Sequence, residues 1–235
     1  SEITIIERFR SDSGAQSLVV PVVEIHAAPA ARVKYVAVNE LGPTVWQIGH
    51  QLAWADRDAT VSLSTIALGG EYARVRAEAV ATGPGSTTRQ TALYFADDNQ
   101  MHDFRTIQSH VAPRSQSNLL FKGAVKDTAR SVYTGLIRIG HDAKGAAAFQ
   151  TNRNLTLSSG AWAESVPNLE IETNDVKCSH ASTVGPIDED QLFYLESRGV
   201  NPDVAQRLVV LGFFDEVLAQ LPVGKYPLQL AARSS

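Results

Sequence analysis

Most of this chain reads as a series of short β-strands, and that pattern restricts the folds it can adopt. From about residue 3 to residue 185, runs of alternating apolar and polar side chains are separated by turn residues. In one run Val61 and Leu63 alternate with serines, so one face is apolar. The spacing is close to the roughly 8–12 residues typical of an all-β domain. The expected strands are Ile3–Phe9, Ser17–His26, Arg32–Asn39, Val45–Ala53, Thr60–Leu68, Glu71–Ala81, Thr87–Phe95, Asp103–His110, Asn118–Val125, Arg130–Ile139, Ala146–Gln150, Asn154–Leu157 and Asn168–Thr173.

A sandwich, a barrel and a β-solenoid all satisfy this pattern. Two features favour the solenoid, in which each coil stacks on the one before it. The strands are too many for one simple sandwich, and the Asn-Gly dipeptides of tight hairpins are missing between the runs. The sequence shows no strict period that would decide among the three folds.

After residue 186 the pattern changes from strands to helices. Asp188, with a glutamine three residues later, is a capping-box arrangement that predicts the start of a helix. Gly199 is a typical residue just past a helix end. We therefore expect a β-domain over residues 1–186 and a C-terminal helical domain over residues 187–235.

A second helix is expected after Asn201, because an N-cap residue followed by Pro202 is a common helix start. We expect this helix to end at Pro222 and Gly224. Its apolar residues extend over more than one face, which allows two interpretations. The helices pack only on each other and on the end of the β-domain, or the additional apolar face binds a partner protein. The candidate partner-binding residues are Phe193, Tyr194, Leu208, Phe213 and Phe214.

The composition excludes several classes of function. The chain has 235 residues and a formal net charge of −4, without a block rich in Lys and Arg, which argues against binding to nucleic acid or to an anionic membrane. No apolar run approaches the roughly 18 residues that span a bilayer, and no signal segment is present. A single cysteine cannot form an internal disulfide, so we expect a cytoplasmic protein.

Common catalytic motifs are also missing, and we expect that the chain is not an enzyme. The sequence contains no phosphate-binding loop of ATPases, no H-E-x-x-H zinc motif and no G-x-S-x-G nucleophile motif. The acidic residues Asp97, Asp98 and Asp103, near His102, are either a cation site or a solvated turn.

The alternative function is that of a β-helix enzyme or binding protein that acts on polysaccharide. The only aromatic platforms for a sugar chain are Trp46, Trp54 and Trp162, with the acidic cluster as possible chemistry. The three tryptophans are not expected to share one repeated position.

Cys178 and His180 are the candidate metal ligands. Two residues apart on a strand, they project from one face, and Lys177 from the other. Thiolate and imidazole both bind iron and zinc, but two ligands do not complete a four-coordinate site. The alternative is that both side chains are structural: a small buried thiol and a hydrogen-bonded histidine.

The same region carries a family resemblance. The segment Asp175–Gly185, DVKCSHASTVG, together with the capped helix Ile187–Gly199 resembles the SufB/SufD family of scaffold subunits of the SUF iron–sulfur cluster assembly system, and in particular its SufD branch. The segments Lys122–Val125, Ala129–Ile139 and Gln150–Leu157 fit the same family.

The resemblance implies a right-handed parallel β-helix core followed by a C-terminal helical domain. It implies a non-catalytic scaffold that pairs with a SufB-type subunit through the end of the β-helix and with a SufC-type ATPase through the C-terminal helices. His180 would lie where a transient iron–sulfur cluster or iron forms, with none permanently bound by this chain alone. Family members carry an N-terminal helical region, which we expect is missing here. Without its partner, the uncovered β-helix end is expected to pair as a homodimer.

Overall fold

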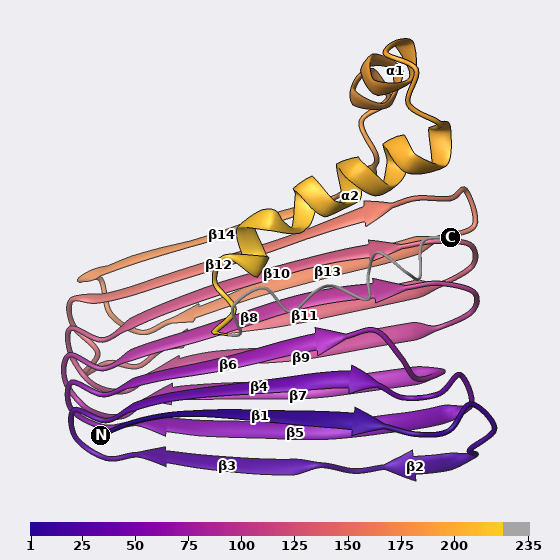
Figure 1. The fold of residues 1–235 in the computed structure, drawn as a ribbon. Helices are drawn as coiled ribbons and strands as arrows, with labels where there is room; N and C mark the ends of the chain where they lie inside the picture. Colours follow the sequence, from indigo (N-terminus) through magenta and orange to yellow (C-terminus); the bar gives the residue numbers. More distant parts are fainter. Residues whose placement is uncertain (223–235) are drawn as a thin grey trace.

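The computed structural model describes residues 1–222, which form a parallel β-helix followed by two helices (Figure 1). The elements are β1 (Glu2–Arg10), β2 (Ser17–Val19), β3 (Val22–Ala27), β4 (Arg32–Glu40), β5 (Val45–Ala55), β6 (Thr60–Ala67), β7 (Tyr72–Ala81), β8 (Thr87–Ala96), β9 (Met101–His110), β10 (Gln116–Val125), β11 (Arg130–Ile139), β12 (Ala146–Thr156), β13 (Trp162–Ile171), β14 (Val176–Pro186), α1 (Glu189–Ser197) and α2 (Pro202–Leu218).

The strands form two parallel sheets that face each other around one interior. Sheet A has the order β1-β4-β6-β8-β10-β12-β14, and sheet B the order β13-β11-β9-β7-β5-β2, with β3 also paired to β5. The chain passes alternately between the sheets and completes about six turns. Figure 1 shows the turns stacked from β2 and β3 at one end to β13 and β14 at the other. The mainly β, parallel β-helix architecture predicted from the sequence is confirmed, and the sandwich and barrel are excluded.

The corners of the helix explain why the sequence shows no strict period. Ala30, Asp58, Gly85, Arg114 and Gly145 occupy the same corner in successive turns, and all have a φ between 54° and 72°. Their positions differ by 27 to 31 residues, so the turns vary in length. Glycine adopts this left-handed conformation without strain, and aspartate tolerates it better than most residues. The repeat is therefore one of backbone geometry.

Three strand boundaries differ from the sequence prediction. Ser17–His26 is two strands, β2 and β3, because Pro21 lacks a backbone N–H and interrupts the ladder. The two runs predicted between residues 146 and 157 are one strand, β12, since it pairs without interruption with both β10 and β14. Strand β13 begins at Trp162, earlier than predicted.

Both predicted helix starts are confirmed. Asp188 accepts hydrogen bonds from the backbone N–H groups of Asp190 and Gln191, and Asn201 accepts one from Asp203, so each cap satisfies donors that lack an intrahelical partner. Gly199 follows α1 with a φ of +85°, as expected for a glycine past a helix end. The predicted end at Gly224 lies outside the described residues.

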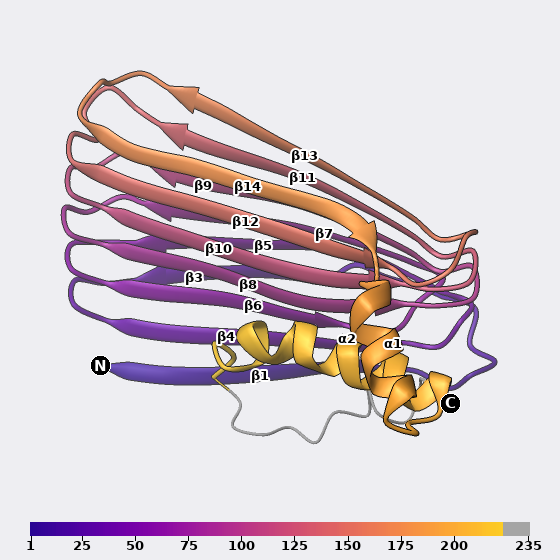
Figure 2. The ribbon, with the colours of Figure 1, turned by 90° about the horizontal axis from the view of Figure 1, so that it is seen from above.

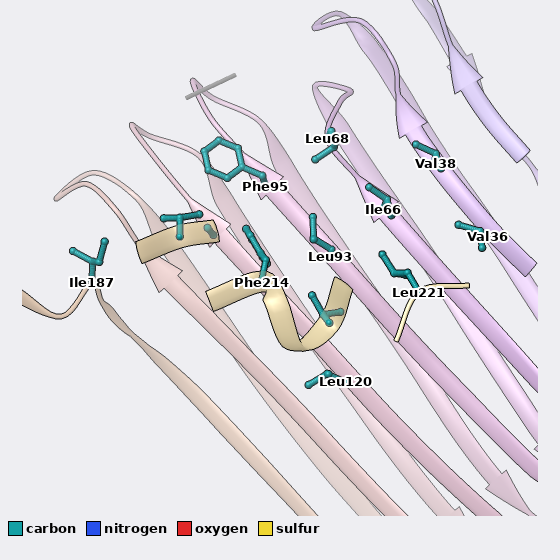
Figure 3. Packing of buried hydrophobic residues seen from close by; sticks show 13 residues of the cluster. Val36, Val38, Ile66, Leu68, Leu93, Phe95, Leu120, Ile187, Phe214 and Leu221 are labelled. Atoms are coloured by element: carbon teal, nitrogen blue, oxygen red, sulfur yellow. The ribbon is translucent and has the colours of Figure 1, made fainter. Parts of the chain in front are cut away.

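Helix α2 lies on the outer face of sheet A, not on the end of the β-helix as predicted. One continuous hydrophobic cluster joins the helix and the sheet (Figure 3). The cluster contains Val36, Val38, Ile66, Leu68, Leu93, Phe95, Leu120 and Ala124 from the sheet side and Ile187, Val210, Phe214, Val217 and Leu221 from the helical side. Figure 2 shows that β14 leads directly into α1. The predicted C-terminal helices are confirmed, and α2 shares one core with sheet A.

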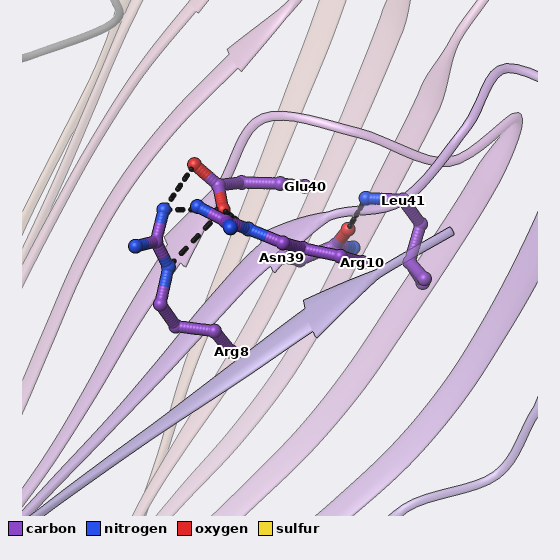
Figure 4. A network of polar contacts seen from close by, with 5 residues as sticks. All are labelled: Arg8, Arg10, Asn39, Glu40 and Leu41. Carbon is purple, nitrogen blue, oxygen red and sulfur yellow. Dashed lines mark hydrogen bonds and ion pairs between the residues drawn. The ribbon is translucent and has the colours of Figure 1, made fainter. Parts of the chain in front are cut away.

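Ion pairs hold the first strand of sheet A. Arg8 and Arg10 on β1 both contact the carboxylate of Glu40 on β4, at 2.7 and 2.8 Å (Figure 4). At the end of β4, the Asn39 side chain accepts a hydrogen bond from the backbone N–H of Leu41 at 3.0 Å. Strand β1 is mostly exposed and, among residues 1–222, pairs only with β4, so these contacts help to hold it at the edge of the sheet.

Candidate functional site

The last turn of the β-helix is open. Strand β14 pairs with β12 and strand β13 with β11, and among residues 1–222 no strand pairs with the outer edge of either one. Both strands are largely exposed, in contrast with the buried strands before them. The open turn also exposes the apolar residues Leu169, Ile171 and Val184. An unpaired, partly apolar strand edge is suited to pairing with another chain.

The structure places Cys178 and His180 on β14, in this open turn. Cys178 is in register with Ala148 of β12, and His180 with Gln150. Ala148 and Gln150 are buried, so their neighbours on β14 belong to the inward-facing set. Because no further turn covers β14, Cys178 is only half-buried and His180 is exposed. The two side chains thus lie on the same side of the strand, opposite Lys177, at the mouth of the interior.

The two candidate ligands have different surroundings. The free thiol of Cys178 packs at the edge of a cluster formed by Ile137, Ile139 and neighbouring alanines. Burial raises the pKa of the Cys178 thiol, which keeps it protonated at neutral pH. Within the described chain, no three His, Cys, Asp or Glu side chains come together in a way that would hold a metal ion. Any further donors for a metal ion at Cys178 and His180 would have to come from a second molecule.

A buried polar network, which was not predicted from the sequence, fills the interior below the open turn. The Tyr94 hydroxyl contacts the side chain of Asn154, and Asn152 donates to that hydroxyl at 3.2 Å. The two asparagines are linked to each other at 2.8 Å. A Cβ at Gly123 would come within 1.8 Å of the Tyr94 ring, so only glycine leaves room for it. Residues from the Lys122–Val125 and Gln150–Leu157 segments thus meet in the interior.

Gln150, like His102, is an exception to this pairing. Its side chain is 2% exposed, yet neither its Oε1 nor its Nε2 has a hydrogen-bond partner of good geometry among residues 1–222. The hydroxyl of Ser165, on the facing strand β13, is also buried and unpaired. Strand alternation would have placed Gln150 inward, but only the three-dimensional register shows that it lies beside His180.

The helices form a second candidate surface. Phe193 is 72% exposed, and Tyr194 and Leu208 are also exposed. A groove of about 800 Å³ lies between α1, α2 and the end of β12, and Tyr194, Leu208 and the partly buried Phe213 contribute to its walls. Phe214 differs from the other candidates, because it is fully buried in the cluster between α2 and sheet A and has no surface to offer a partner.

A lysine ties α2 to the sheet. The side chain of Lys122 on β10 is only 5% exposed and contacts the carboxylate of Glu216 at 2.6 Å. Its Nζ also donates to the backbone carbonyl of Phe213 at 2.9 Å and lies 4.9 Å from the centre of that ring. The hydrogen bond from Lys122 lowers the pKa of the Glu216 carboxyl. The position of α2 is therefore fixed by a polar contact as well as by apolar packing.

Of the two alternatives for the acidic residues near His102, a cation site or a solvated turn, the structure supports the turn. Asp103 faces outward from sheet B and is paired with Arg105 at 2.8 Å, whereas His102 faces the interior and is fully buried. Asp98 lies in a turn with a φ of 51°. The Asp103 carboxylate and the His102 imidazole therefore lie on opposite sides of sheet B, and Asp98 lies in an exposed turn.

As expected, the three tryptophans do not share one position, although two of them do. The register across β5, β7, β9, β11 and β13 places Trp46 and Trp162 in one lateral row on sheet B, together with Tyr72, Met101 and Arg130. Trp54 lies in a different row, stacked on His26 with the ring centres 4.1 Å apart. For the polysaccharide hypothesis, the structure provides two tryptophans in one row but no acidic cluster beside them.

Fold and site together define a class of protein: a parallel β-helix with an open last turn and a helix pair on one sheet. Residues 1–213 match the family model described as the SufBD core domain of the SUF system for FeS cluster assembly. None of the helices in the described chain has the length and apolar character to cross a membrane.

Two curated relatives illustrate the match. The chain is 38% identical over 218 residues to an iron–sulfur cluster assembly SufBD family protein of Mycobacterium leprae, covering 89% of this chain and 56% of that protein. It is 33% identical over 233 residues to the iron–sulfur cluster assembly protein SufD of Escherichia coli, covering 99% of this chain and 55% of that protein. The chain belongs to the SufBD family and spans about half the length of these relatives.

Proposed function

We propose that this chain is a non-catalytic scaffold subunit of the SUF iron–sulfur cluster assembly system and acts in the cytoplasm. The observation that carries the proposal is the open last turn, where Cys178 and His180 lie side by side at the mouth of the interior. An open turn with two metal-binding side chains is incomplete by itself, so a partner chain must supply the remaining ligands.

The partner at the open end is a SufB-type subunit. Its strand edge would meet the unpaired edge of β14 and cover the exposed apolar residues Leu169, Ile171 and Val184. His180 then faces the partner and transiently binds iron or a forming cluster, which is the cargo of the scaffold. In the absence of this partner, a second copy of the chain takes the same place and forms a homodimer.

The second partner is a SufC-type ATPase at the helices. The groove lined by Tyr194, Leu208 and Phe213, with Phe193 exposed beside it, would accept an apolar element of the ATPase. Because Lys122 and the buried apolar cluster fix α2 to sheet A, movement imposed on the helices would be transmitted to the β-helix. The scaffold therefore positions the cargo while its partner hydrolyses ATP.

The test is anaerobic reconstitution with iron and sulfide in the complex of this chain with its SufB-type and SufC-type partners. His180→Ala should abolish the cluster absorbance while the complex still forms. Ser179→Ala, one residue away but on the opposite face of β14, is the matched control and should leave the signal unchanged. A normal cluster signal from the His180→Ala complex would show that the chain is a structural partner only.

A further inference from the structure

Two cationic side chains line one pocket beside α2. Lys126, directly after β10, and Arg207 on α2 both contribute to its walls. The apolar walls come from the end of sheet A and from α2: Phe95, Leu157, Val210, Leu211 and Phe214. Phe95 and Phe214 belong to the buried cluster between the helix and the sheet (Figure 3). No residue of α2 lines both this pocket and the groove beside α1, so the two lie on different faces of the helix.

The guanidinium of Arg207 has no acceptor. Its Nε is buried and without a hydrogen-bond partner among residues 1–222. The other described side chains with such atoms are glutamines, serines and His102, which are neutral at pH 7, whereas a guanidinium keeps its charge. Asp203 also lines the pocket, but within residues 1–222 no ion pair joins it to Arg207 or Lys126. A partly buried charge without a partner is costly, so this one calls for an anion.

The contact between β10 and α2 contains a matched pair of charges further along. The Nζ of Lys122 lies 2.6 Å from the Glu216 carboxylate, and Arg153 lies 3.9 Å from the same group. Arg207 precedes Glu216 by nine residues, or about 13.5 Å of helix. Lys126 follows Lys122 by four residues, or about 13 Å of extended chain. The equal steps bring Lys126 and Arg207 to one pocket as like charges, whereas Lys122 meets an acid.

The size of the pocket restricts what can bind. Its cavity of about 40 Å³ is far smaller than the roughly 300–1,000 Å³ of cofactor sites. The space suits the end of a single side chain. A carboxylate on a short apolar stem, as in glutamate, would place its methylene groups against Phe95 and Phe214 and its oxygens towards the two cations. With Asp203 included, the three charged walls carry a net charge of +1, which suits a monoanion better than a phosphate.

We propose that this pocket receives an acidic side chain of the SufC-type ATPase. The ATPase then holds α2 from two sides, with an apolar element in the groove beside α1 and a carboxylate between Lys126 and Arg207. The identity of the partner rests on the function proposed above. The unmatched charges do not, because they are a property of this chain alone.

The experiment is calorimetric titration of the full chain with the SufC-type ATPase at about 50 mM and about 300 mM salt. Lys126→Met and Arg207→Met should each weaken binding by about tenfold at the lower salt concentration, the size of one charge-assisted hydrogen bond. Both variants should also lose less affinity than the original chain when salt is added, because a charge pair has been removed. Lys126→Arg keeps the charge and should preserve binding.

The control for net charge is Arg57→Met. Arg57 is exposed in the turn where the chain enters sheet A, whereas Lys126 lies where the chain leaves it. This variant should bind the ATPase with unchanged affinity and salt dependence.

A stability measurement excludes a general structural effect. Methionine keeps the apolar stem of Arg207 and removes the contact between like charges, so Arg207→Met should be at least as stable as the original chain to denaturant. Weaker binding by a chain of undiminished stability is the expected signature of a binding residue. A loss of stability that accompanies the loss of affinity would assign Arg207 a structural role and overturn the proposal.

Leu208→Ser in the groove separates this inference from the proposed function. If Leu208→Ser weakens ATPase binding and both methionine variants bind normally, the helices remain the ATPase site and the acidic contact is wrong. If the methionine variants weaken binding and Leu208→Ser does not, the acidic contact stands and the groove is not used. Unchanged affinity in all three variants would contradict both.

Discussion

The middle turns of this β-helix and its last turn have the same architecture but different chemistry. In the middle, inward-facing polar side chains are buried and largely paired, as in the contacts among Tyr94, Asn152 and Asn154. In the last turn, Cys178 is half-buried and His180 is exposed. The difference arises because each turn completes the surroundings of the one before it, and within the described chain nothing completes the last.

This contrast separates stability from function. Residues in the middle turns, and those that fix α2 to them, should matter mainly for folding. Residues of the last turn and the exposed helix surface should matter mainly for assembly with partners. The predictions below test the separation, beginning with the largest expected effect on stability.

Phe214→Ala should lower the free energy of unfolding by about 3–5 kcal/mol. The ring is 0% exposed in the cluster between α2 and sheet A, and its loss would leave a cavity in a shared core. Phe193→Ala, which removes a 72% exposed ring from α1, is the matched control and should change stability by no more than about 0.5 kcal/mol. Chemical denaturation measures both. Equal losses would mean that α1 is as firmly packed as α2.

Acid should destabilise the chain through the histidines of the middle turns. Burial lowers the pKa of His102 and His110 to about 4, whereas in the unfolded chain both titrate near 6.5. Between these values the unfolded state takes up protons that the folded state does not, so stability is fully present above about pH 6.5 and falls down to about pH 4. The expected loss is about 2 kcal/mol per histidine between pH 7 and pH 5.

The variant that tests this pH dependence is His102→Phe, because the ring lies among Tyr94 and Phe104 and phenylalanine suits that aromatic site. Denaturation at a series of pH values should show about half of the loss in this variant. A slope that is unchanged in His102→Phe would mean that the buried histidines of the middle turns are not the source of the pH dependence.

Lys122→Met should have the smallest of these effects, about 1–2 kcal/mol. The substitution removes the ion pair to Glu216 and the hydrogen bond to the carbonyl of Phe213. Because Glu216 is half-exposed, water screens the ion pair and reduces its contribution to stability. Glu216→Gln keeps the lysine and should cost less. Hydrogen exchange should become faster in α2 and remain unchanged in β11. Unchanged exchange in α2 would mean that apolar packing alone holds the helix.

Much of the fold could be predicted from the sequence, because its signals are local. Alternation at residues such as Val61 and Leu63 predicted the strands, and the caps at Asp188 and Asn201 predicted the helix starts. The choice of a solenoid rested on family resemblance, since the turns vary in length and leave no sequence period. The site of α2 was misplaced, because an apolar helix does not specify which apolar surface it covers.

The candidate site was predictable only in part, for the same reason. The spacing of Cys178 and His180 put them on one face of a strand, but not in an open turn. The pairing of His180 with Gln150, thirty positions earlier, depends on the register between β12 and β14. Phe214 was grouped with exposed residues because its burial comes from sheet A, which is distant in the sequence.

The most direct test of the central claim is hydrogen exchange of this chain, alone and with its SufB-type partner. The account predicts slower exchange in β14 (Val176–Pro186) and β13 (Trp162–Ile171) on binding, with no change in β1, β2 or β3 at the other end of the β-helix. Protection of β1–β3, with β14 unchanged, would contradict it and place the partner at the opposite end.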